Sequence, residues 1–557
     1  MTTYVNPRYA YRRIPERDGE VRHYPVVIVG AGPVGLAAAI DLGQRQVPVV
    51  VLDDDDTVSV GSRAICWSKR TLEILDRLGC AENLVQKGVR WNVGKVFHRD
   101  ALLYQFDLLP EGGHRRPAFV NLQQYHVEEC LVSRAMALPN VELRWNNKVV
   151  GVQGGQGDKV RLRVACPDRE YDVTCDWLIA ADGAKSVVRR ELGLESEGQV
   201  FRDRFLIVDI RMRSEFPPER WFWFDPPFHP NQSVLLHRQA DDVWRVDFQL
   251  GWEAEPEEEK MPERILPRLR AMLGHEAQFE IEWASVYTFS CRRMQRFRHG
   301  RVLFVGDAAH LLSPFGARGA NSGIQDVDNL VWKLGAVLKG DAPDRLLDTF
   351  DAERCAAADE NMRVTTASTD FITPKSAMSR VFRDAVLGLA KRYPFARKLV
   401  NSGRLSVPHV CMDSPLNTLD ERESSWQGAM MPGAPAADAP VRGPQGEWLL
   451  DHLGGEFVLL LFYGRIDGSL AAGLRQAAMP CRVVQVGGGA STGIATIEDT
   501  DRLIEKRYDA KPGTCYLIRP DQIVCARWRA FDHRAVCGAI ARASSTTAVQ
   551  ELACHPS

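Results

Sequence analysis

The chain has 557 residues, of which 45% are hydrophobic and 25% charged, a composition typical of a globular protein. The length predicts several domains. A net charge of −2 gives no indication of a nucleic-acid or anionic-membrane partner, and no apolar run is long enough to span a bilayer. Thirteen cysteines without a C-x-x-C pair argue against a zinc ribbon and a dithiol motif. We therefore expect no metal site and a cytoplasmic protein with reduced thiols.

Residues 1–23 are predicted to form an N-terminal arm, because they lack the apolar segment of a secretory signal. Residues 24–53 predict a strand, a turn, a helix and a second strand. The turn has the spacing G-x-G-x-x-G, formed by Gly30, Gly32 and Gly35, with Pro33 at the start of the helix. This turn allows a pyrophosphate to approach the helix N-terminus. Asp53 ends the second strand, where a carboxylate can bind ribose hydroxyls, so we predict dinucleotide binding.

The middle of the chain predicts a second nucleotide-binding element and an inserted sheet. Residues 171–193 form an apolar strand that ends at Asp182-Gly183, followed by a helix start. Residues 200–290 contain alternating and aromatic segments such as FLIVDIRM, WFWFDPPF, SVLLHR and WRVDFQL, which are typical of an antiparallel sheet.

The segment RVLFVGDAAHLLSPFGARGANSGIQDVDNLVWKL, at 301–334, predicts a strand at 302–305, a Gly306-Asp307 turn, a loop and a helix. The apolar residues of the helix recur at helical spacing: Ile324, Val327, Leu330, Val331 and Leu334. A carboxylate and a helix N-terminus in this place suit the hydroxylated linker and the electron-poor ring of a flavin. Residues 322–405 are predicted to be mostly helical.

Residues 429–445 are predicted to be a linker or loop rich in Pro, Ala and Gly, followed by a small α/β domain. Gly489–Gly493 spells G-x-S-x-G after an apolar strand, but the following residues are a poor helix start. A hydrolase is therefore disfavoured, because a nucleophile elbow needs a helix there.

These motifs together resemble the class A flavoprotein aromatic hydroxylases, and most of all their 3-(3-hydroxyphenyl)propionate hydroxylase branch. The resemblance covers about residues 24–400 and, more loosely, the C-terminal domain. It implies an α/β fold: a Rossmann-like FAD-binding domain, an inserted antiparallel-sheet substrate domain, a helical segment and a thioredoxin-like C-terminal domain without C-x-x-C. The expected boundaries are 1–23 for the arm, 24–199 and 291–425 for the two FAD-binding parts, 200–290 for the substrate sheet and 426–557 for the C-terminal domain.

The resemblance also implies cofactor contacts. Asp182 and Gly183 match a motif for FAD and NAD(P)H together, and Asp307, after Gly306, would bind the flavin ribitol. Arg63 and Gln124 would contact FAD, with Gln123 as the alternative to Gln124. Residues of the loop before the helix are expected at the flavin ring: Pro314, Gly316, Gly319 and Asn321.

The implied reaction uses NADPH or NADH to reduce FAD, and O2 then gives a flavin C4a-hydroperoxide that transfers oxygen to a phenolic substrate, in aromatic catabolism. The substrate strand WRVDFQL carries no tyrosine, so Asp247 and His237 are candidates for the phenol-activating base. Arg318 is hypothesised to raise the flavin potential, because its cation would stabilise a reduced flavin; the alternative is a solvent-facing arginine paired with an acid.

Four aromatic residues of the sheet are expected to line a substrate pocket or else to belong to the core: Trp221, Trp223, Phe224 and Phe228. The same segment faintly resembles the W-x-W-x-I-P signature of flavin-dependent halogenases, with Asp225 where Ile is expected. A halogenase is the alternative function, and a non-enzymatic FAD-binding protein is a weaker one. The C-terminal domain is expected to be structural or to support oligomerisation, and the protein to be a homodimer.

Overall fold

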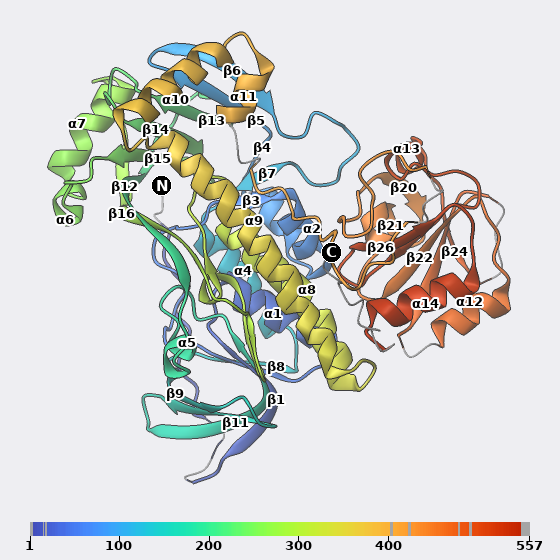
Figure 1. Ribbon diagram of the computed structural model, residues 1–557. Helices are drawn as coiled ribbons and strands as arrows, with labels where there is room; N and C mark the ends of the chain where they lie inside the picture. Colours follow the sequence, from blue (N-terminus) through green and yellow to red (C-terminus); the bar gives the residue numbers. More distant parts are fainter. Residues whose placement is uncertain are drawn as a thin grey trace, which may run out of the picture. The chain divides into compact units, whose positions relative to one another are not determined.

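The computed structural model describes residues 4–14, 16, 19–400, 405–420, 425–476, 479–488 and 493–546 (Figure 1). Four residues of the G-x-S-x-G segment, 489–492, lie outside these ranges. The chain divides into two compact units. The first contains Met1–Pro110, Arg116–Gln325 and Ala358–Val407, and the second contains Glu111–Arg115, Asp326–Ala357 and Pro408–Ser557.

A largely parallel sheet in the first unit has the strand order β17-β18-β11-β1-β2-β8, extended at β11 by β10 and then β9. The strands are β1 (Arg22–Val29), β2 (Val49–Leu52), β8 (Val141–Arg144), β9 (Lys148–Gly154), β10 (Val160–Ala165), β11 (Glu170–Ala180), β17 (Arg298–His299) and β18 (Val302–Phe304). Helix α1 (Pro33–Gln44) connects β1 to β2, as predicted. Val26–Val29 of β1 and all residues of β2 and β18 are buried and apolar, as expected for strands covered on both faces.

A second, mostly antiparallel sheet has the order β19-β16-β12-β15-β14-β13-β5-β6. Its strands are β5 (Val93–His98), β6 (Ala101–Asp107), β12 (Glu197–Arg211), β13 (Arg220–Phe224), β14 (Ser233–Arg238), β15 (Val243–Leu250), β16 (Glu280–Arg293) and β19 (His310–Leu311). The predicted strands between residues 200 and 290 are confirmed. Strands β5 and β6 come from residues 93–107, and β5 pairs with β13 in parallel. This long-range pairing cannot be predicted from the local pattern of apolar and polar residues.

Strand β13 presents different aromatic residues to the two faces of this sheet, because successive side chains of a strand point in opposite directions. Phe222 and Phe224 belong to one apolar cluster, which also contains Tyr104 and Phe315. Trp221 and Trp223 pack with Phe228 against the cluster on the other face. The expectation of one pocket for all four aromatic residues is therefore correct only for Phe224, which lines the cavity described below.

The remaining elements of the first unit are mostly helical. They are α2 (Lys69–Arg77), α3 (Ala81–Lys87), α4 (Gln124–Met136), α5 (Val187–Glu191), α6 (Pro256–Glu259), α7 (Pro262–Leu273), α10 (Ala377–Ala390), α11 (Pro394–Val400) and a small sheet of β3 (Cys66–Ser68), β7 (Phe119–Asn121) and β4 (Val89–Trp91). Helices α8 (Gly319–Lys339) and α9 (Asp348–Ile372) contain residues of both units. The predicted helical region is confirmed. No helix in the described ranges is long and apolar enough to cross a bilayer.

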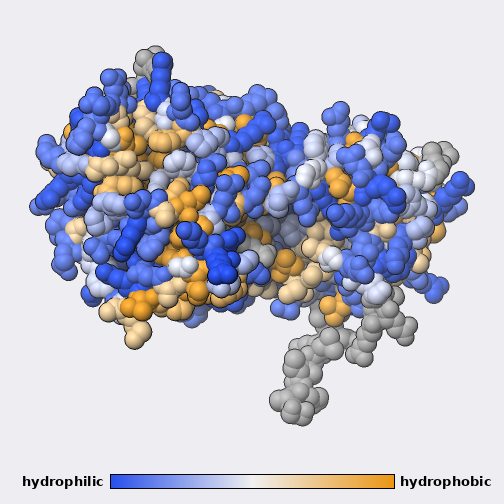
Figure 2. Space-filling model, turned by 90° about the horizontal axis from the view of Figure 1, so that it is seen from above, coloured by the Kyte–Doolittle hydropathy of each residue, from blue (hydrophilic) through white to orange (hydrophobic). Residues whose placement is uncertain are grey.

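On the face drawn in Figure 2, hydrophobic side chains form several patches separated by hydrophilic ones. Exposed apolar side chains are concentrated on α10 and α11, where Met378, Val381, Phe382 and Phe395 are each more than half exposed.

The second unit contains a sheet of order β24-β23-β22-β25-β26 and a hairpin of β20 and β21. Its elements are β20 (Pro440–Gly443), β21 (Gly446–Trp448), β22 (Phe457–Phe462), α12 (Gly468–Arg475), β23 (Cys481–Val486), β24 (Ala495–Ile497), α13 (Leu503–Arg507), β25 (Cys515–Ile518), β26 (Val524–Trp528) and α14 (His533–Ala543). The expected linker at 429–445 is wrong in part. Residues 440–443 form β20, and Ala434, Ala436 and Ala439 are buried.

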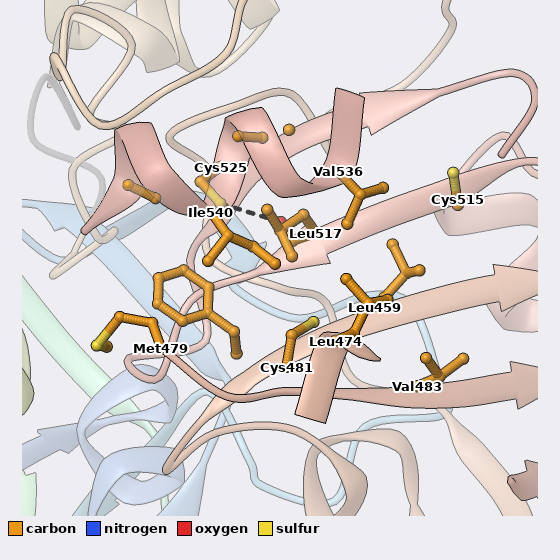
Figure 3. Packing of buried hydrophobic residues seen from close by; sticks show 14 of the residues in the cluster. Leu459, Leu474, Met479, Cys481, Val483, Cys515, Leu517, Cys525, Val536 and Ile540 are labelled. Atoms are coloured by element: carbon orange, nitrogen blue, oxygen red, sulfur yellow. Dashed lines mark hydrogen bonds between the residues drawn. The ribbon is translucent and has the colours of Figure 1, made fainter. Parts of the chain in front are cut away.

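The core of this sheet is apolar but rich in sulfur. Figure 3 shows Leu459, Cys481 and Val483 of the sheet near Val536 and Ile540 of α14. The Cys525 thiol donates a hydrogen bond of 3.4 Å to the Leu517 carbonyl oxygen. Burial raises the pKa of the Cys515 and Cys525 thiols to about 12, so they remain protonated and unreactive.

Candidate active site

The three glycines of the first turn are in different surroundings. A Cβ atom on Gly30 would lie 2.5 Å from the Ala181 carbonyl oxygen, and one on Gly35 would lie 2.0 Å from the Gly30 carbonyl oxygen. A Cβ atom on Gly32 would meet no atom within 4 Å. Packing therefore requires Gly30 and Gly35, whereas Gly32 borders open space at the N-terminus of α1. This arrangement fits a pyrophosphate at the helix N-terminus, where Pro33 occupies the first position.

Asp53 lies beside this turn, as its position at the end of β2 predicts. Its Oδ2 accepts a hydrogen bond of 2.5 Å from the Ala31 amide, and Oδ1 accepts one of 2.9 Å from the Asp55 amide. Burial raises the pKa of Asp53 to about 6, and Asp54 and Asp55 add to this effect. A partly desolvated carboxylate next to the dinucleotide turn fits the binding of ribose hydroxyls.

The Asp182-Gly183 pair contacts the same turn from β11, since the backbone at Ala181 and Asp182 packs against Gly30. Asp182 Oδ2 accepts a hydrogen bond of 3.0 Å from the Val188 amide at the start of α5. Its Oδ1 is buried and has no hydrogen-bond partner among the described residues. Burial raises the pKa of this carboxyl group. A buried acceptor of this kind is unusual in a native protein and indicates a ligand or water nearby.

Gly306 and Asp307 lie close to α1, although they are far from it in sequence. The side chain of Val34, on α1, would be 3.1 Å from a Cβ atom on Gly306 and 2.7 Å from one on Gly323. The turn before Asp307, the N-terminus of α1 and the first turns of α8 therefore meet at Val34. Asp307 is exposed and raises the pKa of Tyr287, after the larger effect of burial.

The loop before α8 is held by the side chain of Asn321. Asn321 Oδ1 accepts a hydrogen bond of 2.9 Å from the Ser68 amide, and Nδ2 donates to the carbonyl oxygens of Cys66 at 2.8 Å and Ala317 at 2.6 Å. These bonds tie α8 to strand β3. Pro314 is exposed, Gly316 is buried, and Gly319 borders open space.

Arg318 is only 5% exposed, which excludes the alternative of a solvent-facing arginine. Its Nη1 donates a hydrogen bond of 2.5 Å to Asn361 Oδ1 on α9. Burial lowers the pKa of Arg318, and Glu360 opposes this effect. The cation is therefore held close to the N-terminus of α8 by a neutral amide.

The segment around Arg63 is connected to Gln124 and to the substrate sheet. Gln124 Oε1 accepts a hydrogen bond of 3.0 Å from the Ala64 amide, and Nε2 donates one of 2.8 Å to Glu128. Arg63 itself is exposed. Gln123 is 1% exposed and donates a hydrogen bond of 3.1 Å to the Ala240 carbonyl oxygen.

Arg245, on β15, holds the Arg63 segment in place and was not singled out from the sequence. Its guanidinium donates hydrogen bonds to both Asp209 oxygens at 2.8 Å and to the backbone carbonyls of Ser62 and Arg63. It thus connects the substrate sheet to the Arg63 segment. Its charge at an inward-facing position of the strand WRVDFQL is the feature of the sequence that could have indicated a buried ion pair.

Asp247 and His237 lie on the same face of the sheet, in adjacent rows, where Leu235 pairs with Asp247 and His237 with Arg245. Burial raises the pKa of Asp247 to about 6, although Arg245 and Arg220 oppose this effect. Burial also holds the pKa of His237 well below its usual value, with Arg220 and Arg245 nearby. His237 is therefore neutral.

A cavity opens on this face at the β6, β5 and β13 end of the sheet. Its lining includes Gly316 from the loop before α8, Ser368 and Ile372 from α9, and neither Asp247 nor His237. Its aromatic lining consists of Tyr104, Phe106, Phe222, Phe224 and Phe315. Arg220, at the start of β13, also lines the cavity and was missed by the sequence analysis. The cavity suits an aromatic ligand beside the proposed flavin loop.

Comparisons with known proteins show the family and the fold of this chain. Residues 23–365 match the family described as "FAD binding domain". The chain is 30% identical to the 6-methylpretetramide 4-monooxygenase of Streptomyces rimosus over 537 residues, covering 92% of this chain and 91% of that protein. It is 28% identical to the 3-(3-hydroxy-phenyl)propionate/3-hydroxycinnamic acid hydroxylase of Mycolicibacterium smegmatis over 383 residues, 67% of this chain and 66% of that protein. The crystal structure of the flavin-dependent monooxygenase PieE in complex with FAD and substrate superimposes with a TM-score of 0.79 at 21% identity, covering 94% of this chain and 99% of that one.

Proposed function

Because this chain belongs to the class A FAD-dependent aromatic hydroxylases and is a flavin-dependent monooxygenase, we propose that it hydroxylates a phenolic substrate with NAD(P)H and O2, without a partner reductase. The observation that carries this proposal is the aromatic-lined cavity that includes Gly316 of the loop before α8. An aromatic ring in this cavity would lie next to the loop at which the flavin ring is expected.

FAD fits the chemistry of the residues brought together here. The open space at Gly32 would take the pyrophosphate, and Asp53 would bind the ribose hydroxyls. Asp307 would bind the ribitol, and residues 314–321 would contact the ring. When bound, FAD supplies the means by which electrons from NAD(P)H and O2 deliver an oxygen atom to the substrate. The protein groups bind and orient the phenol and exclude water from it.

The activity is tested by loading the purified protein with FAD and measuring NADH and NADPH oxidation in the presence of a panel of phenols. The methyl ether of each phenol is the matched control. We expect at least one phenol to stimulate oxidation and to yield a hydroxylated product, without an added reductase. Activity that appears only with an added flavin reductase would contradict the single-component mechanism and favour a halogenase. Product analysis separates hydroxylation from release of peroxide.

The halogenase alternative is not favoured by the surroundings of its faint signature. Trp221 and Trp223 point away from the cavity-lining face of β13 and pack into the opposite cluster. Lys95 Nζ also lies 5.4 Å from the centre of the Trp221 ring. These contacts explain the two tryptophans as packing residues.

Arg318 is proposed to raise the flavin potential through its buried cation. Replacing Arg318 with Ala should lower the midpoint potential, and a loss of about 1.4 kcal/mol corresponds to about 30 mV for a two-electron couple. Arg318→Lys should retain part of the effect, because the charge is kept. Spectroelectrochemical titration measures the potential, and an unchanged value in the Ala variant would exclude the role.

The second unit is proposed to include a thioredoxin-like domain without a redox role. Support comes from its topology. Strands β22 and β23 are parallel and are connected through α12, β25 and β26 join the sheet in antiparallel pairing, and α14 follows them in the chain. A cytoplasmic location is proposed because none of the twelve cysteines in the described part of the chain forms a disulfide. A homodimer is proposed because α10 and α11 expose large apolar side chains; sedimentation equilibrium would give its mass.

A further inference from the structure

Arg220 is a buried cation without a direct protein partner. The residue is 8% exposed and lines the cavity. Among the residues that the structure describes, only electrostatic neighbours act on its side chain, without a hydrogen bond or ion pair. Nearby cations on the same sheet are paired. Arg245 contacts Asp209 at 2.8 Å, and Lys95, whose ammonium group lies over Trp221 on the opposite face, contacts Glu219 at 2.7 Å. Arg220 thus differs from Arg245 and Lys95 in having no acidic partner in direct contact.

A largely buried charge without a hydrogen-bond partner is costly, because the hydration that a guanidinium loses is only partly replaced. The electrostatic neighbours of Arg220 are Asp247 and the Cys66 thiol, which act on it without a hydrogen bond or ion pair. An anionic ligand in the cavity would form an ion pair with this guanidinium and would thereby explain why an arginine is buried at this position.

A second polar side chain that lines the cavity is also buried without a hydrogen-bond partner. Tyr104 is 5% exposed, and its buried hydroxyl has no hydrogen-bond partner among the described residues. Strand pairing puts the two residues on one face: Tyr104 pairs with Val96, which pairs with Phe222, and Arg220 is two residues before Phe222 on β13. Strands β6 and β13 are separated by two strand spacings, about 10 Å. Two long side chains at this separation can reach opposite ends of one aromatic ligand.

We propose that Arg220 determines specificity by binding an ionised oxygen of the aromatic substrate, and that the Tyr104 hydroxyl donates a hydrogen bond to another substrate oxygen. This inference rests on the proposed function, because it assumes that the cavity holds the substrate. A phenol would bind as its conjugate base and release its proton to solvent, whereas a carboxylate would bind as it is. Binding as phenolate would make the ring electron-rich without requiring Asp247 or His237 as a base.

The probes are three ligands of similar size: 4-nitrophenol, 4-nitrobenzoate and the neutral methyl ether 4-nitroanisole. Their binding to the FAD-loaded enzyme is measured by flavin difference absorbance as a function of pH. The variants are Arg220→Met, Arg220→Lys and Tyr104→Phe. Arg238→Met is the matched control, because Arg238 lies on β14 of the same sheet and its guanidinium lies over Trp244, on the opposite face.

We expect the wild-type enzyme to bind at least one of the two anions at least about tenfold more tightly than the ether, and to lower the pKa of any bound phenol by about 1–3 units. Arg220→Met should lose this preference and keep its affinity for the ether. Arg220→Lys should retain part of the preference for the anion. Tyr104→Phe should weaken this preference less than Arg220→Met does, and Arg238→Met should leave it unchanged. Preference for 4-nitrophenol identifies phenolate recognition, and preference for 4-nitrobenzoate identifies carboxylate recognition.

Thermal unfolding without ligand separates ligand recognition from a structural role. At about pH 4.5, where Asp247 is protonated and no longer attracts Arg220, removal of the cation should leave the melting temperature of Arg220→Met equal or higher, whereas a structural arginine would give a lower one. The inference is overturned if Arg220→Met has a lower melting temperature or keeps the anion preference. If the wild-type enzyme binds the ether and the anions equally while phenols still stimulate NAD(P)H oxidation, the inference about Arg220 is wrong but the proposed function stands. If no phenol binds and none stimulates NAD(P)H oxidation, both the proposed function and the inference about Arg220 are wrong.

Discussion

At the residue scale, Gly32 and Gly35 belong to one motif but support different properties. Gly32→Ala should fold normally, since its methyl group would meet no atom within 4 Å, and should weaken FAD binding by entering the pyrophosphate space. Gly35→Ala should destabilise the fold, because its methyl group would lie 2.0 Å from the Gly30 carbonyl oxygen. Thermal unfolding of the apoprotein and titration with FAD measure the two effects. Equal loss of stability in both variants would refute this division.

Asp247 should make stability depend on pH in a defined direction. Burial raises its folded pKa to about 6 from an ordinary value of 3.8, and Asp209 adds to this, while Arg245 and Arg220 oppose it. The folded state thus holds this proton more tightly than the unfolded chain, so the contribution of Asp247 to stability falls as the pH rises from about 4 through 6.

Asp247→Asn lacks this ionisation. Its free energy of unfolding relative to the wild type should therefore be higher at about pH 7.5 than at about pH 4, by up to about 3 kcal/mol. Urea denaturation at the two pH values measures the difference. An equal difference at both values would show that Asp247 titrates normally.

At the element scale, the N-terminal arm packs on the segment that follows Asp53. Tyr4 stacks on Tyr125 with ring centres 4.2 Å apart, and Tyr9 stacks on Trp145 at 4.6 Å. Asn6 Nδ2 donates to the carbonyl oxygens of Val58 and Ser59, and the Tyr9 amide donates to that of Asp56. Ser59 in turn donates to Glu128, which accepts a hydrogen bond from Gln124. The arm is thereby connected to two expected FAD-binding segments.

Deletion of residues 2–11 should therefore weaken FAD binding about tenfold, or about 1.4 kcal/mol, because the loop after Asp53 loses its support. Titration of the apoprotein with FAD measures this. Arg8→Ala is the control, since its ion pair with Asp56 is exposed and should contribute little. An unchanged FAD affinity in the deletion variant would show that the arm has no part in holding the cofactor.

At the scale of the whole molecule, the second unit contains a buried network of charges centred on Glu353. Glu353 accepts hydrogen bonds from Lys333 at 2.8 Å and from Arg519 at 2.6 and 3.1 Å, and Arg519 also pairs with Asp521. The network connects α8, α9 and the segment after β25. The two cations hold the pKa of Glu353 well below its usual value despite burial.

Glu353→Gln should destabilise this unit by about 3–5 kcal/mol, because it leaves two buried cations with too little negative charge. Glu498→Gln is the control in the same unit, since its ion pair with Arg442 is exposed. Chemical denaturation measures the loss. A Glu353→Gln variant as stable as the control would show that the network is not needed for stability.

How much of the site could be predicted depended on how far apart in sequence its residues are. Gly30, Asp53, Asp182 and Asp307 each follow a strand end or precede a helix within a few residues, so local pattern was enough to find them. Arg318 was also found, but its burial and its contact with Asn361 were not, because α9 is more than twenty residues away along the chain.

The sequence by itself determined the dinucleotide turn, the strands and helices around the motifs at 24–53, 171–193 and 301–334, and the family, because these depend on short-range spacing of glycines, carboxylates and apolar residues. Only the tertiary structure decided which residues line the aromatic cavity. Arg220 and Tyr104 meet there because β13 pairs with β5, more than one hundred residues earlier in the chain. A two-residue alternation predicts two faces for β13, but it cannot say which face meets the loop before α8. That choice follows from the packing of distant elements, which removes the Arg220 cation from water and turns it toward the cavity.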